Sequence, residues 1–264
     1  MTTYPRLGRD RQKRIASLRL ARFRKRYGLA FTEGIRSVRA ALEGGASVVE
    51  VVIADSAAPG VSDTLTLGGL PVFLVTDNEF ARLSDVQTEQ GILATFRLET
   101  RAFDPLEPGL NRVVLLDGVQ DPGNVGTIIR TAAWYGVGAV VAGPGTADYY
   151  NPKTVRATMG SLWSTSLHTV DDLAAAVTQL HGAGFQTFAA AAGASEPVAP
   201  ATGSAAVVFG SEARGISRDV LERAHKVVSV LRGSESAVHV VDSLNVSVAA
   251  GIVLDRLFGQ AASE

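Results

Sequence analysis

The second half of the chain alternates short apolar runs with helical patterns, and this alternation limits the choice of fold more than any other feature. Val113 to Leu116 reads as a strand that is apolar throughout, and Val125 to Tyr135 follows it as a helix. Strands that are apolar on both faces are typical of parallel sheets covered by helices on both sides. The pattern therefore predicts an α/β fold whose ligands bind beyond the carboxyl ends of the strands. It continues with strands at 138–142, 185–190, 205–209 and 227–231, and with helices at 171–180, 218–224 and 244–258.

The first half of the chain is less regular and indicates a small α/β unit. Arg11 to Tyr27 reads as a basic helix, and Glu33 to Leu42 as a second helix that ends before two glycines. The stretch 97–111 contains two prolines and no periodic pattern, so we place a boundary within it. The predicted domains are residues 1–104 and 105–264. Strands are expected at 48–53, 71–75 and 91–96, and a short helix at 78–83.

Charge is distributed unevenly along the chain. The totals are 25 lysines and arginines against 26 acidic residues, a formal net charge of −1, which by itself argues against a strongly basic nucleic-acid binder. Residues 1–30 nevertheless contain ten basic residues and a single acid, Asp10, so this segment carries +9 and the remainder −10. Such a block is either a polyanion-binding patch or a solvated tail.

The same segment bears on localisation. No apolar stretch follows the charges, which excludes a secretory signal peptide. A mitochondrial-type transit peptide fits less well, because the charges run directly into a folded pattern. No uncharged apolar run reaches the roughly 20 residues of a membrane span. We therefore expect a cytoplasmic protein that does not contact a membrane.

Cysteine is absent from the sequence. Its absence excludes disulfide frameworks, cysteine-ligated zinc and a cysteine nucleophile, including RNA base methylation through a thiolate. The four histidines lack the spacing of metal ligands, so no metal is expected.

Three loops carry more chemistry than a turn requires. The first, residues 117–136, contains a Pro122-Gly123 turn, Asn124 as a candidate N-cap, and a helix N-terminus that could hold an anion. It matches neither a phosphate-binding P-loop nor a dinucleotide fingerprint. Arg130 is the only charged residue between Asp121 and Asp148. Taken alone, it is most simply an arginine at a helix edge.

The second loop, residues 209–215, places a Ser211-Glu212 pair between glycines, which implies close backbone approach to a ligand or to another loop. In the third, Asp242 or Ser243 could cap a helix in which Asn245 and Ser247 are polar among apolar residues. The alternatives are a simple strand-to-helix turn and a core helix with satisfied hydroxyls.

Taken in order, the three loops resemble those of the SpoU/TrmH family of RNA ribose 2′-O-methyltransferases, in the SPOUT superfamily. The family pattern Asn-x-Gly-x-Ile-x-Arg-Thr-Ala matches 124–132, Gly-Ser-Glu-x-x-Gly matches 210–215, and Ser-Leu-Asn-Val-Ser matches 243–247. Residues 151–160 also resemble the family's segment between the first two motifs. The first half is similar to the family's substrate-binding domain, which has an L7Ae/L30e-like ribosomal-protein fold; the matching stretches are 24–26, 31–34 and 90–94.

The resemblance implies an α/β SPOUT domain with a C-terminal trefoil knot, S-adenosylmethionine as methyl donor, and a homodimer. A knot departs from the usual rules of chain topology, and periodicity does not predict one. One motif differs from the family pattern. The family's Ile-Pro-Met-x-Gly corresponds here to Val230-Leu231-Arg232-Gly233, and about five extra residues precede Ser243. The details of the contact with the cofactor's adenine are therefore open.

The resemblance also implies roles for individual residues. Arg130 acts on the ribose hydroxyl, and because a guanidinium stays protonated we expect it to orient that hydroxyl or a phosphate and stabilise the developing alkoxide. Asn124 fixes loop and substrate, Glu212 positions Arg130 or a backbone amide, and Ser243 and Asn245 line the pocket. The backbone at Gly210, Val230 and Leu244 holds the cofactor. The RNA phosphates bind the basic residues Arg19, Arg22, Arg24, Lys25 and Arg26.

Several readings remain open. Ribosomal RNA is favoured over transfer RNA as substrate, because the extra domain resembles a ribosomal-protein fold. A tRNA 2′-O-methyltransferase is the alternative enzyme. A non-catalytic RNA-binding paralogue is supported by the altered third motif, and a ribosome-associated factor would use only the first half. A generic nucleotide-binding α/β protein would not explain why Arg130, Glu212 and Asn245 occur in this order.

Overall fold

The computed structural model describes residues 4–99, 101–231 and 243–259. Contacts divide the chain into two compact units. The first comprises Met1–Glu99 and Asp148–Ser164, and the second comprises Thr100–Ala147 and Thr165–Glu264. No helix in the described ranges has the length and apolar character that crossing a bilayer requires.

The first unit is built on a four-stranded sheet in the order β1-β4-β2-β3. Strand β4 is antiparallel to both of its neighbours, and β2 and β3 are parallel. The strands are β1 (Leu29–Glu33), β2 (Val48–Ala54), β3 (Val72–Val75) and β4 (Ile92–Arg97). The helices are α1 (Arg9–Ser17), α2 (Ala21–Tyr27), α3 (Ile35–Glu43), α4 (Ala58–Thr64), α5 (Asp77–Leu83), α7 (Pro152–Thr158) and the 3₁₀ turn η1 (Ser161–Trp163).

The prediction of one long basic helix over 11–27 is wrong, because the helical conformation is interrupted between α1 and α2. Leu18 is fully buried at the break, and Leu20 has extended backbone angles. The side chain of Arg24 donates hydrogen bonds to the carbonyls of Leu18 and Arg19, both at 2.8 Å. These bonds satisfy carbonyls that a helix end leaves free. The hydrophobic periodicity did not reveal this break of three residues, 18–20. Arg24, four to six positions further along the chain, stabilises it.

The helix expected from Glu33 begins later, and a strand precedes it. Strand β1 has every residue buried, including Thr32 and Glu33. Gly34 then turns the chain with φ of +90°, and α3 starts at Ile35. The polar residues in β1 concealed its strand character, since the partners that satisfy Glu33 are distant: Ser84 and Asp85 lie 51 and 52 residues away, and Arg156 lies 123 residues away.

The second unit contains a seven-stranded sheet in the order β7-β6-β5-β10-β8-β11-β9, and every neighbouring pair is parallel. This confirms the predicted parallel sheet. Its strands are β5 (Arg112–Asp117), β6 (Ala139–Ala142), β7 (Ser166–Thr169), β8 (Gln186–Ala190), β9 (Glu196–Pro197), β10 (Ala205–Gly210) and β11 (Lys226–Ser229). Its helices are α6 (Pro122–Trp134), α8 (Leu173–Gly182), α9 (Arg218–Leu221) and α10 (Val246–Phe258).

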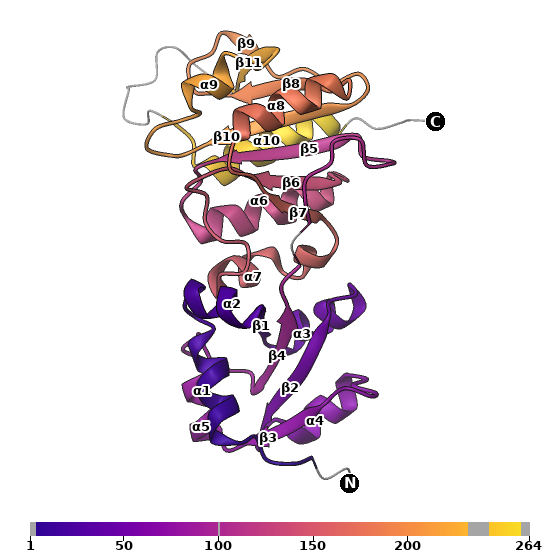
Figure 1. Ribbon diagram of the computed structural model, residues 1–264, viewed down its shortest axis with the longest axis vertical. Helices are drawn as coiled ribbons and strands as arrows, with labels where there is room; N and C mark the ends of the chain where they lie inside the picture. Colours follow the sequence, from indigo (N-terminus) through magenta and orange to yellow (C-terminus); the bar gives the residue numbers. More distant parts are fainter. Residues whose placement is uncertain (1–3, 100, 232–242, 260–264) are drawn as a thin grey trace. The chain divides into compact units, whose positions relative to one another are not determined.

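Both faces of this sheet are buried, as the unbroken apolar strands predict (Figure 1). Val113 and Leu115 of β5 pack in one core with α8 and α9. The alternate residues Val114 and Leu116 are also fully buried, on the other face. Helix α10 packs against β10 and against α6. This arrangement brings the start of α6 and the start of α10 together near the carboxyl edge of the sheet.

The segment 148–164 belongs to the first unit, which differs from the single boundary expected at 104/105. Tyr150 and Trp163 both pack on Phe96 of β4, with ring centroids 6.1 and 5.5 Å away. A side chain at Gly160 would collide with Ala40 of α3, at 2.4 Å. Residues 151–160 therefore have an architectural role: Asn151 caps α7, Pro152 starts it, and Gly160 allows close packing.

Candidate active site

The candidate site begins with two loops at the carboxyl edge of the parallel sheet. After β5, the Gly118 amide donates to the Thr146 hydroxyl at 3.1 Å, with the glycine at φ of +69°. Asp117 at the end of β5 accepts a hydrogen bond from the Ser217 amide at 2.6 Å. The loop after β5 is thereby tied to the loops after β6 and β10, so the three form one continuous edge.

Three side chains from the three sequence motifs meet at this edge. The Asn124 amide Nδ2 donates to Glu212 Oε1 at 2.5 Å. Asn245 Nδ2 donates to Asn124 Oδ1 at 3.1 Å. Asn245 Oδ1 accepts from the amides of Ser247 and Val248, at 2.9 and 3.3 Å. The amide of Asn124 is thus oriented from both ends, and we call these three residues the Asn–Glu–Asn cluster.

The capping residues differ from those expected. Helix α6 is capped by Asp121, whose carboxylate accepts from the Asn124 amide at 3.0 Å, so Asn124 lies inside the first turn. Helix α10 is capped by Asn245, and Ser243 lies before the helix, exposed. Asp242, the other candidate, lies outside the described residues. Because Asp121 satisfies the helix end, the side chain of Asn124 is available for Glu212 and for a ligand.

The loop after β10 owes its shape to Gly210. Ser211 and Gly215 exchange two backbone hydrogen bonds, at 3.1 and 2.7 Å, and so close a tight turn with Glu212 in it. A Cβ on Gly210 would lie 2.3 Å from the carbonyl carbon of Gly215. Any side chain at position 210 would therefore push this turn open and move Glu212 away from Asn124.

Arg130 is not part of the cluster. It lies on α6, six residues after Asn124 and so about 9 Å further along the helix axis. Its side chain is exposed and makes no hydrogen bond or ion pair within the ranges that the structure describes. Thr127 and Trp134 share this outward side of α6, and Trp134 is 83% exposed. Arg130 therefore lies on the solvent-exposed side of α6.

The expected cofactor residues lie along the same edge. Gly210 ends β10, and Val230 directly follows β11, with β8 between these two strands. Leu231 and Leu244 are exposed apolar side chains on either side of residues 232–242. The altered stretch at Arg232 and Gly233 lies outside the described residues. Exposed leucines beside the strand ends suit a flat, partly apolar ligand such as an adenine ring.

Among the residues described, no three or more histidines and acids gather as metal ligands. Two histidines do meet elsewhere in the second unit, which the sequence did not suggest. Their rings lie 4.1 Å apart, and His181 Nε2 and His225 Nδ1 contact the hydroxyl of the buried Thr187 at 2.8 and 3.0 Å. Burial and the neighbouring His225 lower the pKa of His181. Thr187 lies near the amino end of β8, so this pair is at the opposite edge from the cluster.

Half of the basic N-terminal residues are used within the first unit. The fully buried Glu50 accepts ion pairs from Arg11 and Arg14, at 2.7 and 3.3 Å. Arg6 pairs with Asp55 at 2.8 Å. These acids lie on β2 and just after it, so the surface charge of the segment is smaller than its sequence suggests.

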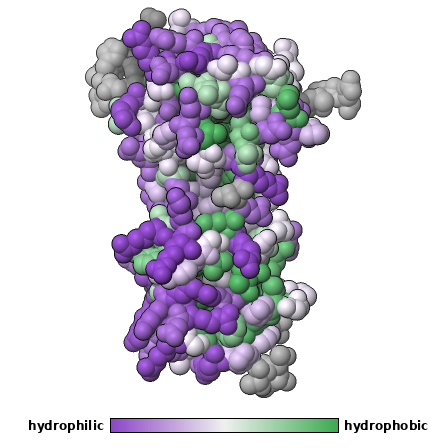
Figure 2. All heavy atoms as spheres, viewed as in Figure 1, coloured by the Kyte–Doolittle hydropathy of each residue, from purple (hydrophilic) through white to green (hydrophobic). Residues whose placement is uncertain are grey.

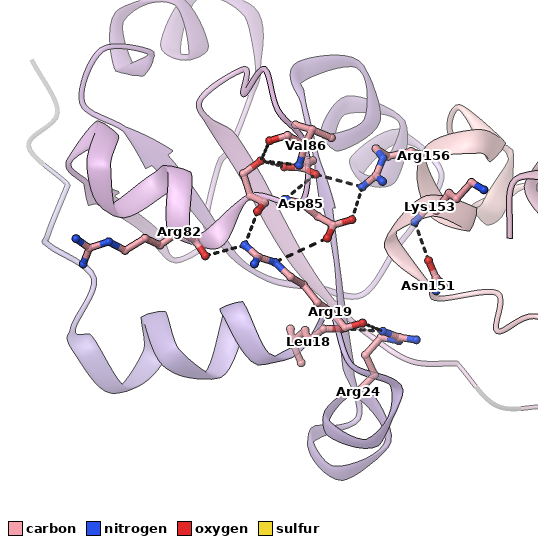
Figure 3. Close-up of polar contacts among 11 residues, drawn as sticks. Leu18, Arg19, Arg24, Arg82, Asp85, Val86, Asn151, Lys153 and Arg156 are labelled. Carbon is pink, nitrogen blue, oxygen red and sulfur yellow. Dashed lines mark hydrogen bonds and ion pairs between the residues drawn. The ribbon is translucent and has the colours of Figure 1, made fainter.

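Arg19 and Arg24, two of the expected RNA-binding residues, make contacts within the first unit (Figure 3). Arg24 is 2% exposed, and besides the two carbonyls it pairs with Asp148 at 2.5 Å. Arg19 donates to the carbonyls of Arg82 and Ser84 and lies 3.8 Å from Asp85. Asp85 also accepts from Arg156 at 3.0 Å. The other three expected residues, Arg22, Lys25 and Arg26, are exposed on α2.

Comparisons with known proteins bear on both units. Residues 111–255 match the SpoU rRNA Methylase family model, and residues 10–94 match the MRM3-like substrate binding domain. The 23S rRNA (guanosine(2553)-2′-O)-methyltransferase RlmP of Bacillus subtilis is 31% identical over 86% of this chain and 87% of its own length. The RlmB 23S rRNA (guanosine-2′-O-)-methyltransferase of Coxiella burnetii is 33% identical over 70% of this chain and 76% of its own.

Solved structures agree along nearly the whole chain. A protein from Porphyromonas gingivalis that is assigned to the TrmH family of RNA methyltransferases has a TM-score of 0.82 and 30% identity, covering 97% of this chain and 99% of its own. An AdoMet-bound rRNA methyltransferase from Sinorhizobium meliloti has a TM-score of 0.80 and 24% identity, covering 96% of this chain and 95% of its own. The second likeness shows the fold.

Proposed function

Because the chain belongs to the SpoU rRNA methylase family, we propose that it methylates a ribose 2′-hydroxyl of structured RNA, with S-adenosylmethionine as donor. Membership confirms the resemblance drawn from the three loops. The Asn–Glu–Asn cluster carries the proposal, because it joins all three motifs at the ligand-binding edge of the sheet. Ribosomal RNA is the favoured substrate, since RlmP and RlmB are named as ribosomal RNA enzymes.

The cofactor supplies an electrophilic methyl group on its sulfonium. In this chain the backbone at Gly210, Val230 and Leu244 would hold it, with Leu231 and Leu244 beside the adenine. The absence of a side chain at Gly210 lets the backbone of Gly215 and Ile216 approach it closely, which fixes the loop beside this position. Rigid backbone groups hold the donor in one place, and much of the rate of a transfer comes from such positioning.

The cluster supplies a fixed polar group for the substrate. Glu212 accepts from Asn124, so we assign it to positioning Asn124 rather than Arg130. Asn245 holds the opposite end of the same amide while it caps α10. Asn124 is thus set to keep the loop and a ribose or phosphate oxygen in one orientation, and Ser243, exposed two residues before Asn245, would line the same pocket.

Arg130 acts on the substrate hydroxyl from a second copy of the chain. Its exposed side of α6 also carries Trp134, and Leu244 and Val248 are exposed apolar side chains at the start of the neighbouring α10. An apolar group of this kind is typical of a protein interface. In a homodimer, Arg130 of one copy would reach the site of the other. As a permanent cation it would orient the 2′-hydroxyl and stabilise the alkoxide that forms as the proton leaves.

The test is methyl transfer from tritiated S-adenosylmethionine to ribosomal RNA transcripts by wild type, Arg130→Ala and Arg130→Lys. We expect Arg130→Ala to lower the turnover by about 10²-fold or more, as loss of a charge-stabilising donor does, with cofactor binding by calorimetry unchanged. Full turnover of Arg130→Ala would reject the catalytic role. An absence of cofactor binding in wild type would favour the non-catalytic paralogue, and transfer only to transfer RNA would favour the alternative enzyme.

A further inference from the structure

Helix α2 exposes a group of cations that no described residue of the first unit neutralises. Arg22, Lys25 and Arg26 are exposed and make no ion pair within the described parts of the chain. At 100° per residue, Arg22 and Arg26 lie about 160° around the helix from the buried Arg24, and Lys25 lies about 100° from it. Figure 2 shows strongly hydrophilic side chains over α1 and α2 on this edge of the first unit. The surface is complementary to a polyanion.

Two aromatic rings lie among these cations. Phe23 and Tyr27 stack with centroids 6.1 Å apart and planes 12° apart. The guanidinium of Arg22 lies over the Phe23 ring at 4.9 Å, and that of Arg26 lies over the Tyr27 ring at 5.6 Å. Tyr27 is 37% exposed, and its hydroxyl forms no hydrogen bond with any described residue. The Tyr27 ring therefore gives α2 a large, partly open aromatic surface beside unpaired cations.

The buried side of α2 is held in place by hydrogen bonds and an ion pair of Arg24. Arg24 donates to the carbonyls of Leu18 and Arg19 (Figure 3). It also pairs with Asp148, which lies in the inserted segment 148–164. Gly28 ends the helix in the left-handed conformation, its amide bonded to the Arg24 carbonyl. The cations and Tyr27 are therefore presented on a short helix that is held at both ends, so little order has to be gained on binding.

We propose that α2 binds an unpaired stretch of RNA, with Arg22, Lys25 and Arg26 on successive phosphates and one unstacked base on the Tyr27 ring. The inference rests on the proposed function in that the substrate is RNA, and it adds which element reads it and in which form. Phosphate contacts alone do not distinguish a duplex from a loop. Only an unpaired base can stack on an aromatic side chain, and such stacking is how proteins select single-stranded loops.

The test compares a stem-loop whose loop carries 2-aminopurine with a fully paired RNA duplex of equal length, using full-length protein. Tyr27→Ala should weaken binding of the stem-loop about tenfold or more, leave the duplex within about twofold, and abolish the change in 2-aminopurine fluorescence. Tyr27→Phe keeps the ring and should behave as wild type. Equal affinities of wild type and Tyr27→Ala for the stem-loop would overturn the proposal, as would an equal loss on both RNAs.

A matched pair of double variants tests the cations. Arg22→Gln with Lys25→Gln should weaken both RNAs and reduce the salt slope on the stem-loop by about 1.4, at roughly 0.7 per lost phosphate contact. Arg9→Gln with Lys13→Gln removes the same charge from exposed positions on α1 and should change the slope little. Equal effects of the two pairs would overturn the assignment to α2. Thermal unfolding verifies that each variant is folded.

Failure of this inference can be told apart from failure of the proposed function. If wild type methylates ribosomal RNA and Tyr27→Ala binds and methylates equally well, the inference fails and the function stands. If the stem-loop shows the Tyr27-dependent signal but no RNA accepts a methyl group, the function fails and the inference stands. Binding of an acidic peptide at equal affinity would show a protein-binding surface and overturn the inference.

Discussion

The loops of the second unit and the basic segment of the first were both identified from the sequence. In the structure, the loop residues meet in one place, whereas half of the basic residues are paired with acids. Asn124, Glu212 and Asn245 come from distant motifs and meet in one cluster. Of the ten basic residues, five are bound to acids of the first unit, and Arg24 is buried. A polar residue among apolar neighbours in the sequence is a good indication of a functional site. A cation in a run of cations indicates a binding surface only when its acidic partners are known.

The largest expected effect is on the free energy of unfolding, and it comes from Arg24, the buried residue of the basic segment. Arg24→Ala removes the ion pair with Asp148 and leaves the carbonyls of Leu18 and Arg19 without their donor, and we expect it to lower the free energy of unfolding by about 3 kcal/mol. Lys25→Ala removes the adjacent exposed cation and should change it by less than about 0.5 kcal/mol. Urea unfolding of both variants measures the difference. Equal values would show that Arg24 is not structural.

The next largest effect is on methyl transfer, and it tests the role of Glu212 in the Asn–Glu–Asn cluster. Glu212→Ala releases one end of the Asn124 amide, and we expect methyl transfer to fall by about 10²-fold with cofactor affinity nearly unchanged. Glu222→Ala is the control, because it removes an exposed carboxylate of the same unit that pairs with the neighbouring Arg218. A large loss of cofactor affinity in Glu212→Ala would place Glu212 in the cofactor site instead.

A smaller effect concerns the two helices that carry the cluster. The Tyr135 hydroxyl at the end of α6 donates to Asp255 of α10 at 3.0 Å, and this bond to the carboxylate raises the pKa of Tyr135. Tyr135→Phe should cost about 1 kcal/mol of unfolding free energy. Spectrophotometric titration of the tyrosines in Asp255→Asn should show one tyrosine moving to a lower pKa. An unchanged titration curve would contradict the pairing.

The smallest effect comes from the histidine pair. The pKa of His181 is lowered in the folded protein, so its neutral form stabilises the fold fully above the unfolded value of about 6.5. That stability is lost as the pH falls through the lower folded pKa. Unfolding free energies between pH 7.5 and 5 should therefore fall more steeply in wild type than in His181→Gln. Parallel curves would show that His181 does not contribute.

Much of the second unit could be predicted, because a strand that is buried on both sheet faces is apolar at every position, as Val113 to Leu116 is. The edge strands β7 and β9 were not predicted, since they are short and half-polar. In the first unit, β1 and the break before α2 depend on partners far along the chain, Arg24 being the clearest case. The insertion of 148–164 into the first unit depends on packing by Tyr150 and Trp163 that no local pattern records.

The site residues divide in the same way. Motif order identified the cluster, but geometry was needed to show that Glu212 holds Asn124 and that Asp121, rather than Asn124, caps α6. Sequence could not show that Arg130 has no contact within the described chain, because that depends on which side of α6 the second unit leaves open.

The most direct test of the central claim is to incubate the purified protein with methyl-labelled S-adenosylmethionine and unmodified ribosomal RNA, and then hydrolyse the RNA with alkali. A 2′-O-methylated ribose cannot form the cyclic phosphate that alkaline cleavage requires. We predict that the label is recovered in one alkali-resistant dinucleotide and that Asn124→Ala largely abolishes it. Label recovered in mononucleotides, on a base, or none at saturating cofactor would contradict the account.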